Sequence, residues 1–107
     1  MSVARILVPP KAKRGDVVEV RIAIQHPMET GFRMDHNGRK IPKNTVNDLV
    51  CRYNGVVVFR AELGSGIAAN PYLQFHLLAK DSGKVEFAWV DDAGEKGSAA
   101  ASIAVSA

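Results

Sequence analysis

Apolar and polar residues alternate along most of the chain, and this alternation predicts β-strands. In residues 17–24, VVEVRIAI, every second residue is a large apolar one, while Glu19 and Arg21 lie between them. A period of two is typical of a strand with one buried face. The same reasoning predicts strands within 3–8, 46–53, 56–63, 72–80, 84–90 and 102–105.

Turn-forming residues separate these segments. Asn54-Gly55 divides 46–63 and predicts a tight hairpin, because a type I′ turn needs positive φ at both central residues. Pro9-Pro10 ends the first strand, since proline cannot continue a ladder. Pro71 predicts extended geometry at Asn70, and the small residues of 97–102, GSAAAS, predict the approach to an edge strand.

Seven strands, turns about every ten residues and no convincing amphipathic helix predict an all-β fold. We expect an immunoglobulin-like β-sandwich of about seven antiparallel strands, with Phe87 and Trp89 in its core. A chain of 107 residues is long enough for one domain, residues 1–107, to fold without disulfides or metals.

One connection is much longer than the rest. Residues 25–42, QHPMETGFRMDHNGRKIP, separate two predicted strands, whereas connections of about 4–6 residues are usual. The apolar residues Met28, Phe32, Met34 and Ile41 stand here among charges. The segment is therefore either a docking surface, for which methionine is well suited, or a cover that folds back over the open end of the sandwich.

Charge is distributed unevenly. Residues 1–43 hold nine Lys and Arg against four Asp and Glu, and residues 44–107 hold five against seven. Single-stranded nucleic-acid binders interleave such charges with aromatics, and Phe32 is the only aromatic residue of the basic part. We therefore expect the basic part to be a solvated charged face and not a nucleic-acid binding site. We also expect no membrane partner, because no segment approaches the roughly 20 apolar residues that a membrane span needs.

Candidate metal ligands and nucleophiles are present but poorly arranged. The ligand types of a copper site on a β-sandwich are supplied by His26, His36, His76, Cys51, Met28 and Met34. No His or Met follows Cys51 closely, and strand alternation predicts a buried, inert thiol there. We expect His26 to brace the loop ahead of Pro27. The sequence thus predicts no enzyme, no catalytic residue, no metal and no cofactor.

A set of short motifs resembles the SoxZ family, the small subunit of the sulfur-oxidation carrier complex of thiosulfate-oxidising bacteria. The resemblance extends over residues 3–106 and rests on the order and spacing of five motifs. They are QHPMETGFR, then Asp35, Gly38, Ile41 and Pro42, then YNG (53–55), ANPY followed by Phe75, and Trp89 with the Asp91-Asp92 pair and Gly94.

The resemblance implies a partner. SoxZ proteins pair with SoxY, whose C-terminal Gly-Gly-Cys-Gly-Gly arm carries the sulfur intermediates covalently. The closing residues SIAVSA hold neither that cysteine nor those glycines, so we expect a scaffold subunit of a heterodimer, with transient contacts to other enzymes of the pathway. The family's export alongside a partner with a twin-arginine signal implies the periplasm; the short apolar run near the N-terminus alone would indicate the cytoplasm.

Within the matching motifs, we expect contacts to a partner from Met28, Phe32, Arg33, Met34, Asn70 and Tyr72. Arg and Tyr are enriched where interfaces hold most of their binding energy. These motifs could serve the SoxY-like subunit or later encounters with pathway enzymes. The alternative function is a stand-alone immunoglobulin-like module that binds a metal, a glycan or nucleic acid and has no dedicated partner.

Overall fold

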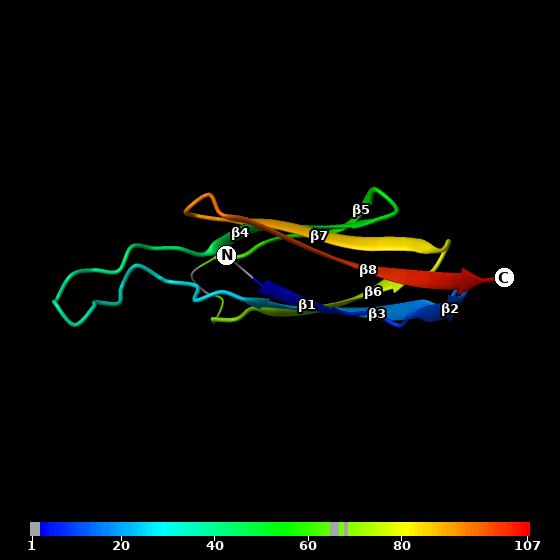
Figure 1. The fold of residues 1–107 in the computed structure, drawn as a ribbon, viewed down its shortest axis with the longest axis horizontal. Helices are drawn as coiled ribbons and strands as arrows, with labels where there is room; N and C mark the ends of the chain where they lie inside the picture. The colour runs from blue at the N-terminus through cyan, green and yellow to red at the C-terminus, as the bar shows by residue number, and fades with distance from the viewer. Residues whose placement is uncertain (1–2, 65–66, 68) are drawn as a thin grey trace.

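The computed structural model describes residues 3–64, 67 and 69–107 and arranges them in two facing β-sheets (Figure 1). No helix occurs among these residues, so the described chain contains none that could cross a membrane. The strands are β1 (Val3–Leu7), β2 (Lys11–Lys13), β3 (Val17–Gln25), β4 (Val46–Tyr53), β5 (Val56–Glu62), β6 (Tyr72–Leu78), β7 (Gly83–Asp91) and β8 (Lys96–Ser106).

The sheets have the orders β1-β3-β6 and β2-β8-β7-β4-β5. All strand pairs are antiparallel except β2 with β8. The predicted all-β, immunoglobulin-like sandwich is therefore confirmed, with one strand more than the seven expected. The extra strand, β2, has the three residues KAK, which are too few to show a periodicity, and it forms where the chain after Pro9-Pro10 crosses to the other sheet and pairs with Ala104–Ser106.

The core lies between the sheets and takes alternate residues from each strand. Val20, Ile22 and Ile24 of β3 face Phe87 and Trp89 of β7, as the alternation predicted, and all five are buried. On the side of β5 and β6, the Phe59 and Phe75 rings stack at 4.4 Å between centroids. Because Phe59 belongs to one sheet and Phe75 to the other, this stack joins the two sheets near their edges.

Local turn chemistry gave one correct prediction and one wrong one. Asn54 and Gly55 have φ of 51° and 83°, which confirms the predicted hairpin. Asn70 has φ of 56°, so the extended geometry predicted from Pro71 is wrong. The side-chain oxygen of Asn70 accepts the N–H of His26 at 3.1 Å, and the backbone N–H of Asn70 donates to the His26 carbonyl at 2.7 Å. These two bonds hold Asn70 in the left-handed backbone conformation, which asparagine adopts more readily than most residues.

The small residues at 97–102 lie along an edge, as predicted, because they pair with β7 on one side and have no strand partner on the other among the described residues; β2 joins β8 at Ala104–Ser106. They belong to β8, which begins at Lys96, is 11 residues long and lies between β2 and β7. Gly97 pairs with Trp89 of β7, and the Trp89 ring covers it. A Cβ on Gly97 would lie 2.3 Å from the nearest ring atom, much closer than real Cβ contacts.

The connection between β3 and β4 extends beyond both sheets. We call residues 26–45 the arm; Figure 1 shows it as the cyan and green excursion at the left. The arm gives the molecule its elongated shape, with principal extents of 60 × 19 × 18 Å.

Candidate interaction surface

The base of the arm is fixed by a buried histidine and a buried carboxylate. Nδ1 of His26 accepts the N–H of Met28 at 2.9 Å, so the ring proton lies on Nε2, which donates to Asp91 at 3.1 Å. Asp91 also accepts the N–H of Glu95 at 2.9 Å. His26 thus braces the loop, as the sequence predicted, and attaches the arm to the end of β7.

These hydrogen bonds set the charge state of Asp91. Burial alone would raise the pKa of this carboxyl group, but hydrogen bonds from His26, from the Glu95 amide and from Asn44 outweigh it and lower the pKa below its ordinary value of 3.8. The ionised form is therefore the one that the fold stabilises.

Replacing Asp91 with Asn should weaken the base of the arm and change its response to acid. A carboxyl group with a lowered folded-state pKa adds stability above its unfolded pKa of about 3.9, and this contribution is lost as the pH falls through the folded value. We expect the variant to lose about 1–3 kcal/mol of unfolding free energy at pH 7. Urea unfolding between pH 7 and pH 3 should show the difference shrinking below about pH 4.

The exposed Asp81 supplies the control, because its ion pair with Arg14 is 4.0 Å long. Asp81→Asn should change stability by no more than about 0.5 kcal/mol. An Asp91→Asn protein as stable as the wild type at every pH would contradict the assigned role of this carboxylate.

A second carboxylate holds the returning side of the arm. Asp92 accepts both the N–H and the hydroxyl of Thr45, at 2.9 and 3.1 Å, and its own N–H donates to the Thr45 carbonyl at 3.0 Å. These bonds from Thr45, together with the Lys43 ammonium at 3.7 Å, keep the pKa of Asp92 below its ordinary value. Both sides of the arm are therefore attached to the turn after β7.

Backbone hydrogen bonds continue along the arm. Glu29 and Asn44 exchange two N–H···O bonds, of 2.8 and 2.9 Å, and the N–H of Ile41 donates to the Arg33 carbonyl at 2.9 Å. Arg33 also pairs with Glu29, at 2.5 Å from guanidinium to carboxylate. Gly31, at φ of 89°, passes so close to Lys43 that a Cβ would lie 3.2 Å from the lysine Cβ. The arm is thus an irregular hairpin with its own internal bracing.

Asp35 forms the tip of this hairpin. Its carboxylate accepts the N–H groups of Asn37 and Arg39, at 2.9 and 3.0 Å, and its own N–H donates to the Arg39 carbonyl at 2.8 Å. Gly38 completes the turn at φ of 78°. An Asp at this place is typical, because its side chain can replace missing backbone partners.

The sequence left two roles open for the arm, a docking surface and a cover over the end of the sandwich, and its apolar residues divide between them. Met28 is 4% exposed and belongs to the core, where its sulfur accepts the N–H of Val46 at 3.3 Å. Phe32 and Met34 are 82% and 58% exposed. Met28 therefore covers the end of the sandwich, while Phe32 and Met34 form an apolar surface beyond it.

The other residues expected at an interface lie elsewhere. Arg33 is next to Phe32 but is engaged by Glu29. Asn70 is exposed beside the base of the arm and holds His26 in place. Tyr72 is exposed on β6, paired with Ala23 in the three-stranded sheet. The structure thus groups Phe32, Arg33 and Met34 in the outer arm, and places Met28, Asn70 and Tyr72 at or in the sandwich.

The residues considered for chemistry do not assemble. Cys51 is a fully buried free thiol, and burial raises its pKa to about 11, so little thiolate forms near neutral pH. Within the described ranges, no three His, Cys, Asp or Glu side chains gather closely enough to hold a metal ion. The buried position predicted for Cys51 is confirmed.

Comparisons with known proteins agree on the sandwich. The superoxide reductase (neelaredoxin) from Ignicoccus hospitalis has a TM-score of 0.71 at 22% identity, with 95% of this chain and 79% of that chain covered. The sulfur carrier protein SoxY from Chlorobium limicola f thiosulfatophilum has a TM-score of 0.66 at 12% identity, with 97% and 79% covered. At such identities the likeness shows a shared fold. No curated protein matches the sequence significantly.

The family comparison is more specific than the structural one. The family described as sulphur oxidation protein SoxZ matches residues 5–102. This span is most of the 107 residues and includes the arm, the hairpin turn and the Asp91-Asp92 pair that holds the base of the arm. The chain therefore belongs to the SoxZ family of sulphur oxidation proteins.

Proposed function

We propose that this chain is the non-catalytic subunit of a sulfur-carrier heterodimer, paired with a SoxY-type subunit that bears the substrate cysteine. Membership of the SoxZ family supports a role in sulfur oxidation. A SoxY protein with the same fold, matched over 97% of this chain, is consistent with two related sandwiches acting together. In this arrangement thiosulfate-derived intermediates are attached to the partner.

The observation that supports this proposal best is the exposed apolar surface of the outer arm. Phe32 and Met34 are held away from the core on a hydrogen-bonded hairpin, where they add nothing to core burial. Exposed aromatic and methionine side chains are enriched at the centres of protein interfaces, and burying them on a partner would recover the hydrophobic free energy lost by exposure. We assign this surface to the SoxY-type subunit.

The side chains of this chain suit a scaffold. The single thiol, Cys51, lies in the core with a raised pKa and is a poor nucleophile there. We further propose that the complex acts in the periplasm, reached by export with the signal-bearing partner. Fractionation of cells with and without that partner tests this: the chain should appear in the periplasm only when the partner is present.

The function is tested by co-expressing the chain with a SoxY-type subunit and measuring native mass, then intact mass of each subunit after incubation with thiosulfate and the sulfur-oxidising enzymes. We expect a one-to-one complex and mass increases on the partner alone. Cys51 should stay unmodified in the folded complex and react with a thiol reagent after unfolding, because its thiol is buried.

Cys51→Ser provides a control for this assignment. The variant should retain partner binding and turnover, at some cost in stability, since a hydroxyl replaces a buried thiol. A chain that stays alone in the presence of the partner, or sulfur adducts on Cys51, would reject the scaffold function.

A further inference from the structure

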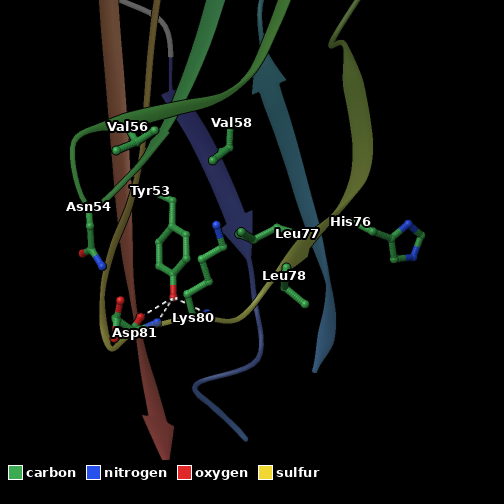
Figure 2. A pocket seen from close by; sticks show the side chains of 9 residues that line it. All are labelled: Tyr53, Asn54, Val56, Val58, His76, Leu77, Leu78, Lys80 and Asp81. Atoms are coloured by element: carbon green, nitrogen blue, oxygen red, sulfur yellow. Dashed lines mark hydrogen bonds between the residues drawn. The ribbon is translucent and has the colours of Figure 1, made fainter. Parts of the chain in front are cut away.

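A groove opens between the edges of the two sheets, on the side where β5 and β6 lie. Its volume is about 450 Å³, within the range of about 300–1,000 Å³ of clefts that hold ligands. Figure 2 shows its lining, which includes Val56 and Val58 of β5, Leu77 and Leu78 of β6, and Tyr53 and Lys80 at the end near the β4–β5 turn. None of these residues belongs to the arm.

Both strands that border the groove are edge strands. Among the described strands, β5 pairs with β4 alone and β6 pairs with β3 alone. The outer backbone groups of such strands are free to pair with another chain, and proteins usually protect them with charges, prolines or short length. Here β2 has three residues with two lysines, and β1 is followed by Pro9-Pro10.

The first half of β5 has neither charge nor proline, and its protection is limited to an irregularity in its pairing with β4. This stretch reads VVVF, and Val56 and Val58 are 65% and 41% exposed. A register shift in the β4–β5 pairing leaves Val58 without a partner on β4, and its side chain lines the groove. An uncharged, exposed edge beside an apolar groove favours recognition of an extended segment, with backbone bonds to the edge and side chains in the groove.

The end of the groove near the turn is rigid and carries a positive charge. The Tyr53 hydroxyl donates to the Asp81 carbonyl and accepts the N–H groups of Asp81 and Lys80, at 3.0 and 3.3 Å. The Lys80 side chain lines the groove together with Tyr53 and Val58 (Figure 2). Among the described residues its ammonium group has no ion-pair partner, so it is available to a carboxylate of a bound segment.

We propose that this groove receives an extended segment of the SoxY-type subunit, with apolar side chains and one carboxylate, as a strand added to the free edge of β5. The inference rests on the proposed function, because that subunit is the occupant. The match to the Chlorobium SoxY covers 79% of that chain, so about a fifth of it has no counterpart in this sandwich, and we assign the added strand to an unmatched stretch of this kind. The carboxylate pairs with Lys80 and sets the register of the added strand.

The test compares wild-type and variant chains, purified alone and mixed with a SoxY-type subunit from the same organism. The variants are Val56→Lys with Val58→Lys, which makes the edge charged, and Lys80→Glu, which reverses the exposed charge without touching the core. Leu7→Lys is the control, because Leu7 is an apolar residue of β1 whose exposure lies between those of Val56 and Val58. We expect both groove variants to weaken binding at least tenfold, Leu7→Lys to have little effect, and wild-type amides of β5 to exchange more slowly in the complex.

The outcomes separate this inference from the function on which it rests. Normal pairing of both groove variants, with unchanged amide exchange in β5, would overturn the groove as a docking site while the heterodimer stands. A wild-type chain that does not pair with the SoxY-type subunit would overturn both. If the double valine variant does not fold, the Lys80→Glu result and the wild-type exchange data decide the question.

Discussion

Replacing Phe32 with alanine is expected to weaken the complex with the SoxY-type subunit about 30-fold, with no change in the melting temperature of the free chain. A buried aromatic at an interface typically contributes about 2 kcal/mol or more, which corresponds to that loss of affinity. The fold should not respond, because the Phe32 side chain is 82% exposed and outside the core. Isothermal titration calorimetry and thermal unfolding measure the two quantities.

Two further variants make this result specific. Leu7→Ala removes an exposed apolar side chain from β1, and should leave affinity unchanged if the effect belongs to the arm. Arg33→Ala is expected to weaken binding as well, partly because it removes the Glu29 ion pair that braces the hairpin. Equal dissociation constants for wild type, Phe32→Ala and Arg33→Ala would remove the arm from the interface.

The largest effect on stability is expected for Gly97→Ala. The new Cβ would lie 2.3 Å from the Trp89 ring, which is itself packed in the core, so either the ring or β8 must move. Overpacking of a core typically costs about 1–3 kcal/mol, and we expect the upper end of this range. For a domain of this size, the melting temperature should fall by more than about 10 °C.

Gly64→Ala is the matched control for this prediction. Gly64 has space for a Cβ, with nothing within 4 Å, and no positive φ. Its replacement should leave stability unchanged or raise it by about 0.4–1 kcal/mol, because alanine restricts the unfolded chain. A Gly97→Ala protein as stable as the Gly64→Ala protein would show that Trp89 does not need the space above Gly97.

The predictions from sequence succeeded where the signal lies within one segment. The alternation of β3 determines which side chains face inward, and Asn54-Gly55 determines a type I′ turn, because both follow from local backbone geometry. The same approach failed at Asn70, where two hydrogen bonds to His26 outweigh the influence of the following proline. That contact joins residues 44 positions apart.

The candidate surfaces show the same contrast between features that a local stretch of sequence predicts and features that depend on distant parts of the chain. The length and composition of the arm indicated a docking segment, but the sequence could not separate Met28, which packs inward, from Phe32 and Met34, which do not. The groove at β5 was missed entirely. Its only signal is the uncharged run VVVF beside a turn, and that run becomes meaningful only once β5 is known to be an edge strand.

The sequence by itself determined seven of the eight strands, the hairpin turn, the inward-facing residues of β3 and β7 and the family, because periodicity, turn chemistry and motif spacing are properties of the linear chain. The tertiary structure decided the order of the strands, the free edges, the strand β2 and the exposure of Phe32. It also decided the pairing of His26 with Asp91, 65 residues away. These features depend on which distant segments meet, and each is settled by competition for partners throughout the folded molecule.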